Sequence, residues 1–213
     1  MMTLAQQYWD YVFLLNLGSY SGEPLDNLKI QKLTFISEDT ARQREKLKAA
    51  NFSFFRYNQG PYSKELADAV RELESLGFVD PETRKPTERG RYILDYVREF
   101  VKESQPAQHA LRILGETCKK YKRVKSSKLV NIVYGMKVPV AQFNGKIMRV
   151  RDIPKHVDII CPGSENLFDF SVFPQEIVED LQTEFSLTPE DISPDNPHNI
   201  SAAQAALDAA IAR

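Results

Sequence analysis

The sequence predicts a mainly α-helical protein that contains a small β-hairpin and ends in a C-terminal α/β extension. Apolar residues recur at three- and four-residue spacing within residues 3–17, 28–36 and 66–76, which is typical of helices with one buried face. A polar turn at residues 80–86 then separates two segments that can pair as strands. After residue 135 the chain becomes richer in β-branched residues and proline, which indicates short strands.

The first two elements are predicted to be long helices. Residues 3–17 form the first helix, which we expect Gly18 to end. The second helix starts at Asp26 or Asn27, because a short polar side chain can accept hydrogen bonds from the free amides of the first turn. Its charged second half is expected to end near Ala50.

The segment that follows is predicted to be a strand, a turn and a third helix. Residues 52–57 are aromatic and read as a short extended strand. Gly60 and Pro61 predict a turn, since glycine allows a positive φ and proline fixes the next φ. Ser63 is a good N-cap for the third helix, and Gly77 ends it.

The order of elements after this helix is typical of a winged helix. A strand is expected at residues 78–79, followed by the polar turn at 80–86 and a new helix from Thr87. The third helix would then be the recognition helix, and residues 80–86 the wing. A generic helical domain with a small β-ribbon fits the same pattern and stays open.

Between residues 107 and 192 the chain is predicted to contain three further helices, at 107–122, 126–134 and 174–185. Residues 138–160 form either one or two short strands or an irregular loop. Prolines at 193–199 indicate a linker before an alanine-rich amphipathic helix at 200–213. We therefore divide the chain into a helical domain (1–135), an α/β extension (136–192), and a linker with a terminal helix (193–213).

The composition predicts a protein that is not embedded in a membrane. The longest apolar run, residues 11–15, is far shorter than the roughly 20 residues that span a bilayer, and no signal peptide is apparent. Cys118 and Cys161 are far apart and form no paired motif, so a reduced, cytoplasmic protein is expected.

Charge is distributed unevenly along the chain. Residues 1–151 hold 26 Lys and Arg against 17 Asp and Glu, a net charge of +9, while residues 152–213 hold 2 against 12, a net charge of −10. Opposite signs indicate an anionic partner for the first part and a cationic partner for the second, or contact between the two parts. Two ordinary solvated surfaces would give the same pattern.

Three motifs resemble the Panacea (SocA-like) antitoxin domain family over roughly residues 5–135. They are Lys29-Ile30-Gln31-Lys32-Leu33 with Phe35, then Gly60-Pro61-Tyr62-Ser63, and then Leu66, Leu73 and Leu76 with Gly77-Phe78-Val79. Two departures are Thr34 at an apolar position and Phe35 in place of the usual tyrosine. The resemblance implies a bacterial or phage cytoplasmic protein that neutralises a cognate toxin by direct protein–protein binding.

The candidate partner-binding residues come from these motifs and from the aromatic strand. Lys29 and Lys32 lie on adjoining sides of one helix, where they either contact a partner or only solvate the helix. Gln31 either joins that surface or hydrogen-bonds the bend near Asn58. The full set is Lys29, Gln31, Lys32, Phe35, Tyr57, Gly60, Pro61 and Tyr62.

A dense basic run provides candidate nucleic-acid contacts, namely Lys119, Lys120, Lys122, Arg123, Lys125 and Lys128. Such cations can bind phosphates, with Tyr121 available to stack on a base. Cations are also favourable at a helix C-terminus, so a solvated helix end explains the same run.

Catalysis finds no support in the sequence. His109, His156 and His198 lack metal-ligand spacing, and no nucleotide-binding loop or nucleophile motif is present. The cluster of Asp152, His156 and Asp158 is interpreted as structural. We therefore expect no catalytic residues, metal or cofactor. The function predicted is an antitoxin, with a DNA-binding winged-helix regulator, including an autoregulatory one, as the alternative; self-association is left open.

Overall fold

A computed structural model describes residues 2–160 and 173–187, and it confirms a mainly helical fold with a small antiparallel sheet. The helices are α1 (Leu4–Ser21), α2 (Asn27–Glu45), α3 (Lys64–Ser75), α4 (Glu88–Tyr96), α5 (Arg98–Glu103), α6 (Gln105–Tyr121), α7 (Ser126–Gly135) and α8 (Gln175–Ser186). The strands are β1 (Phe54–Tyr57), β2 (Gly60–Tyr62), β3 (Lys137–Val140), β4 (Lys146–Arg149) and β5 (Asp158–Ile160), with 3-10 turns η1 (Ala141–Phe143) and η2 (Val150–Asp152).

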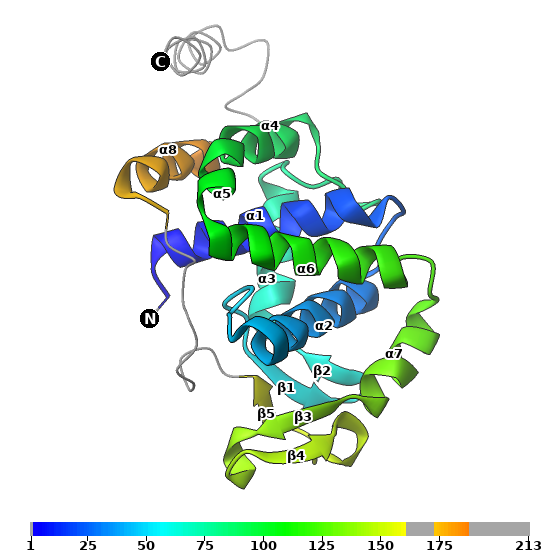
Figure 1. Ribbon diagram of the computed structural model, residues 1–213. Helices are drawn as coiled ribbons and strands as arrows, with labels where there is room; N and C mark the ends of the chain where they lie inside the picture. Colours follow the sequence, from blue (N-terminus) through cyan, green and yellow to red (C-terminus); the bar gives the residue numbers. More distant parts are fainter. Residues whose placement is uncertain (1, 161–172, 188–213) are drawn as a thin grey trace, which may run out of the picture.

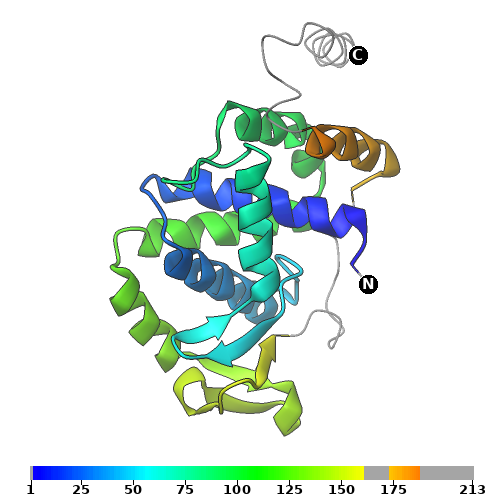
Figure 2. The same cartoon turned by 180° about the vertical axis from the view of Figure 1, so that it is seen from behind.

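Helices α1, α2 and α6 form the centre of the molecule. Helix α6 packs on both α1 and α2, while the strands lie together at one end and α4, α5 and α8 lie at the other (Figure 1; from behind, Figure 2). The core between the helices contains Trp9, Phe13, Leu33, Phe35 and Leu114, each at most 1% exposed. None of the described helices combines the length and apolar character needed to cross a membrane.

The predicted helix starts are confirmed by their capping hydrogen bonds. The Asp26 carboxylate accepts from the Lys29 amide at 2.6 Å, and the Ser63 hydroxyl accepts from the Leu66 amide at 3.1 Å. Gly77 follows α3 with a φ of +75°. Short polar side chains and glycine thus determine these ends, as the sequence predicts.

Gly18 does not end the first helix, which continues to Ser21. A Cβ at position 18 would lie 2.4 Å from the carbonyl oxygen of Arg84. The glycine therefore allows the 80–86 turn to approach the helix closely. That turn closes with a single Val79–Pro86 bridge, so the predicted wing is a tight loop packed on α1.

Helix α2 ends at Glu45, about one turn before the predicted end near Ala50. Lys46 has a φ of +53°, and residues 46–53, the crossing segment, carry the chain to β1 in a largely buried, non-helical form. Buried backbone amides and carbonyls require hydrogen-bonding partners. Side chains on α1 and α2 supply them.

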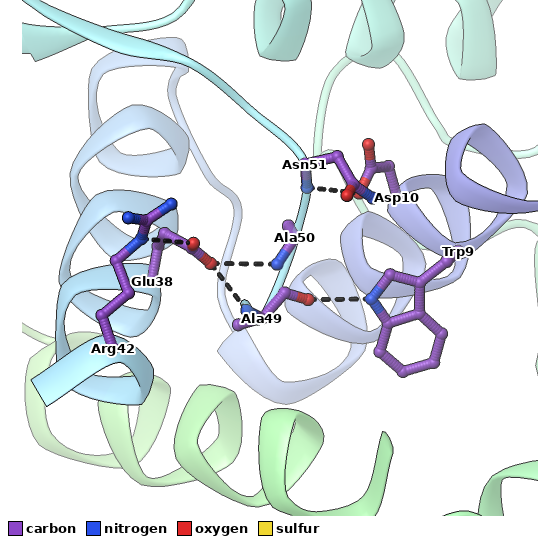
Figure 3. Close-up of polar contacts among 7 residues, drawn as sticks. All are labelled: Trp9, Asp10, Glu38, Arg42, Ala49, Ala50 and Asn51. Carbon is purple, nitrogen blue, oxygen red and sulfur yellow. Dashed lines mark hydrogen bonds and ion pairs between the residues drawn. The ribbon is translucent and has the colours of Figure 1, made fainter. Parts of the chain in front are cut away.

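Figure 3 shows these contacts to the crossing segment. One Glu38 carboxylate oxygen accepts from the amides of Ala49 and Ala50 at 2.8 and 2.9 Å, and the other binds Arg42 Nε at 2.8 Å. The Trp9 indole donates to the Ala49 carbonyl at 2.8 Å. Burial raises the pKa of Glu38, whereas Arg42 and the two amides favour its charged form.

The hairpin turn lies at residues 58–59, two positions before the predicted Gly60–Pro61 turn. Gly60 has a φ of +92° but belongs to β2 together with Pro61. Strand β2 is an edge strand, where proline is tolerated because its missing amide need not pair.

The predicted α/β extension shares a sheet and a core with the helical domain. Strand β5 adds to β1 in the order β2–β1–β5. In α8, the Phe185 ring stacks 5.2 Å from Tyr8 and lies 4.6 Å from Phe78. The predicted linker and terminal helix at 193–213 lie outside the described residues.

Replacing Glu38 with Ala is expected to lower the free energy of unfolding by about 3–5 kcal/mol, because it leaves two buried amides and the Arg42 guanidinium without their carboxylate. Urea unfolding followed by circular dichroism measures the change. Glu103→Ala, an exposed site on α5, is the control and should stay within about 0.5 kcal/mol. Equal stability of the two variants would contradict the role of Glu38.

Candidate functional site

The candidate site is a cleft between α2, the β1–β2 hairpin and α3, with a volume of about 690 Å³. Its position depends on Gln31, in the middle of α2. The Gln31 side-chain oxygen accepts from the Ser63 amide and its nitrogen donates to the Ser63 carbonyl, both at 2.8 Å. Since Ser63 also caps α3, this buried amide fixes the start of α3 against α2.

Lys32 follows Gln31 and holds the strand beside it. Its ammonium donates to the Pro61 carbonyl at 2.6 Å, and the residue is only 2% exposed although it lines the cleft. Burial, followed by the nearby positive charge of Arg56, lowers the pKa of Lys32 to about 8.

Arg56, on β1, is a second buried cation. Its Nε donates to the Val150 carbonyl at 3.2 Å, and its guanidinium lies 4.8 Å from the centre of the Tyr134 ring. Its Nη1 atom is buried and has no hydrogen-bond partner among the residues that the structure describes. Within residues 2–160 and 173–187, neither Arg56 nor Lys32 forms an ion pair.

Aromatic side chains form the rim of the cleft and the adjoining face of the sheet. Tyr57 and Tyr62 line the cleft with ring centres 5.6 Å apart, and Tyr57 is 41% exposed. Phe55 and His156 extend the group, which we call the aromatic rim, with Phe55 lying 5.7 Å from Tyr62 and 6.3 Å from His156. Leu28, Leu66 and Ala67 add apolar surface to the cleft walls.

Five of the eight predicted partner-binding residues line this cleft, namely Gln31, Lys32, Tyr57, Gly60 and Tyr62. Of these, Gln31 and Lys32 are buried and bind the backbone of the hairpin and the α3 start. The alternative reading of Gln31 as a turn-holding residue is confirmed, with Ser63 as the partner in place of the bend near Asn58.

The other three predicted residues do not form an exposed surface. Phe35 is fully buried and packs edge-on against Phe54, because its position on α2 faces the core. Lys29 is 8% exposed and donates to the Lys122 carbonyl at the C-terminal end of α6. Pro61 is buried, and its carbonyl accepts from Lys32.

Sequence reasoning missed Arg56 and the apolar walls of the cleft. Burial alternates along β1, so that Phe54 and Arg56 face inward while Tyr57 is exposed. The sequence does not show this period of two, because Phe54, Phe55 and Tyr57 are all aromatic and the inward Arg56 is charged. The aromatic residues on both sides of Arg56 gave no indication that this cation faces inward.

The predicted nucleic-acid residues lie together at the end of α6 and the start of α7. Lys119, Lys120, Arg123, Lys125 and Lys128 are exposed and Lys122 is half-buried. In the described part of the chain, none of the six forms an ion pair. Lys120 lies over the ring of Tyr121, 5.0 Å from its centre.

Among the described residues, no group of three or more His, Cys, Asp or Glu side chains could hold a metal ion. His156 packs in the aromatic rim, and Asp158 accepts from Gln142. Cys118 is buried, which raises the pKa of its thiol to about 12. No known family model matches the chain, and no curated protein or solved structure does either.

Replacing Lys32 with Met should change how stability depends on pH. Below about pH 8 Lys32 is charged in both states, so its burial lowers stability. Between about pH 8 and 10.5 only the unfolded chain holds the proton, so raising the pH favours the folded state. From about pH 7 to pH 10, the wild-type chain should therefore gain roughly 2–3 kcal/mol relative to Lys32→Met.

Urea unfolding at a series of pH values measures this difference. Lys64→Met, at an exposed position on α3, is the control and should follow the wild-type curve in parallel. A constant difference between wild type and Lys32→Met across the range would show that Lys32 titrates normally.

Proposed function

We propose that this chain is a non-enzymatic, cytoplasmic antitoxin-like protein of the Panacea type, which neutralises a toxin by direct binding. The observation that supports this best is the cleft itself. It combines apolar walls, an exposed tyrosine rim and a fixed backbone frame, which are the features of a protein-binding groove. The cleft lining includes residues from all three motifs that resemble the family, among them Gln31, Tyr62 and Leu66.

The surface of α3 favours protein over DNA as its partner. Its exposed charged residues are Lys64 and Arg71 against Glu65, Asp68 and Glu72. A recognition helix that enters a groove between phosphates is favoured by net positive charge. The packing of the 80–86 turn on α1 likewise leaves less of the wing free to contact a nucleic acid.

A cleft-blocking variant tests the proposal in a growth assay. The neighbouring reading frame is expressed alone and together with this chain; toxicity that disappears on co-expression is the expected result. Ala67→Arg should abolish protection, since a long side chain would fill the cleft from the α3 wall while arginine remains a good helix former.

Ser75→Arg makes a matched change on an exposed part of α3 that does not line the cleft, and protection should persist. Both variants should melt as the wild-type chain does. Full protection by a folded Ala67→Arg protein would remove the cleft from the proposed binding surface.

A second candidate function, nucleic-acid binding, is favoured by one specific observation. Residues 119–157 hold 11 Lys and Arg against the single acid Asp152, a net charge of +10, and all of them belong to the described part of the chain. The six cations around the α6–α7 turn would form this basic face, with phosphates as ligands. Such binding is compatible with an antitoxin that regulates its own gene.

Replacing Lys120, Arg123 and Lys128 together with Ala should weaken binding to duplex DNA and flatten its salt dependence. The slope of log affinity against log salt should become shallower by about 2–3, close to one for each phosphate contact removed. Fluorescence anisotropy at salt concentrations from about 50 to about 200 mM measures it. Arg98→Ala with Lys102→Ala, at the opposite end of the molecule, should leave the slope unchanged. Absence of binding at the lowest salt would exclude this second function.

A further inference from the structure

Among the described residues, the two buried cations beneath the hairpin have no negatively charged partner. Lys32 and Arg56 are 2% and 9% exposed, and the charge of Arg56 acts on Lys32. Their contacts within the described residues are with neutral groups: the Pro61 carbonyl, the Val150 carbonyl and the Tyr134 ring. Burying charge is unfavourable unless an opposite charge or several hydrogen bonds compensate it. The unfavourable free energy of burying these two charges is therefore only partly compensated.

The two cations differ in their access to solvent-filled space. Lys32 lines the cleft, whereas Arg56 does not. Arg56 therefore adds to the positive potential near Lys32 without lining the cleft itself. Gly60 also lines the cleft, and a Cβ there would lie 3.7 Å from Lys32 Nζ and 3.5 Å from the Tyr134 ring. The glycine keeps the hairpin from covering the ammonium with a side chain. An anion in the cleft would therefore meet no side chain of residue 60 between it and the Lys32 ammonium.

The other charged residues of the cleft already have partners. Arg84 pairs with Glu74, and Arg71 pairs with Asp68. This leaves Lys32, backed by Arg56, as the positive charge for a ligand to neutralise. The surrounding walls are apolar or aromatic, with Leu28 on α2, Leu66 on α3 and Tyr57 on the hairpin. One anionic group between apolar groups is therefore complementary to the cleft.

We propose that the cleft binds an acidic peptide segment of the partner protein, and that one Asp or Glu carboxylate of this segment binds Lys32 while its apolar neighbours pack on the walls. This inference rests on the proposed protein-binding function and specifies its ligand. A nucleic acid is less complementary, because it would bring a row of phosphates past Glu74, while Lys32 is the one cation of the described cleft lining that forms no ion pair. A carboxylate flanked by apolar side chains matches the single cation.

A phage library of random linear peptides, selected on the full-length chain, tests the proposal. The selected peptides should share an Asp or Glu flanked by apolar residues, and Ala67→Arg should abolish their binding. Synthetic copies should lose roughly 10- to 100-fold in affinity for Lys32→Met, the range expected when a charged hydrogen bond is removed. Lys64→Met, the exposed control on α3, should bind as wild type does.

A measurement on the unaltered chain covers the case in which Lys32→Met fails to fold. Nuclear magnetic resonance of the lysine ammonium groups should show the pKa of Lys32 rising from about 8 when the acidic peptide binds, because a carboxylate stabilises the charged form. A copy of the peptide with Gln or Asn in place of the acid should bind more weakly and leave that pKa unchanged.

The outcomes separate the two proposals. The selected peptides could instead be neutral, fail to bind Ala67→Arg and bind Lys32→Met as tightly as wild type. That result would overturn the proposal of an acidic ligand and leave the proposal of a protein-binding cleft intact. Peptides that bind Ala67→Arg as well as wild type, or a library that yields no binder, would count against both. Single-stranded oligothymidylate could also displace the peptides and lose affinity for Lys32→Met. That result would replace the proposed carboxylate ligand with a phosphate.

Discussion

The fold depends on one constraint: the chain between α2 and α3, residues 46–63, runs largely buried, so the backbone groups that do not pair within the sheet must find other hydrogen-bonding partners. Glu38 and Trp9 bind its first part at Ala49 and Ala50. Gln31 and Lys32 bind its last part. Because four side chains from two helices hold this segment, the hairpin and the start of α3 take a fixed position over α2, and the cleft forms between them.

This constraint explains why polar residues of α2 were predicted to be exposed although they are buried. Its central residues include Lys29, Gln31, Lys32 and Glu38, all polar and all buried. Polar residues on a helix normally indicate its solvent face, so the sequence predicted an exposed binding surface there. The partners of these side chains are backbone groups up to 93 positions away, and hydropathy carries no information about such contacts. Five of the eight predicted partner-binding residues line the cleft, but the burial of Gln31 and Lys32 was not predicted.

Local features of the fold could be predicted because their causes are local. Asp26 and Ser63 determine helix starts through hydrogen bonds within three residues, and Gly77 follows the end of α3. The pairing of β5 with β1 joins positions about 100 residues apart, and nothing in either segment specifies the other. Gly18 was read as a helix end because glycine usually is one, whereas here it allows close approach of a distant loop. Non-local contacts thus account for most of the differences.

The same arrangement links stability to binding. A hydrophobic residue of similar length at position 32 would avoid the cost of burying an ammonium, yet the cleft floor carries Lys32 with Arg56 behind it. Natural chains retain such locally unfavourable groups mainly where they serve a site. Lys32 also supports the hairpin through Pro61, so an anion bound there would act on the same side chain that positions the cleft. Ligand binding and the position of β2 would then be coupled through one ammonium group, and occupation of the cleft should strengthen the frame around it.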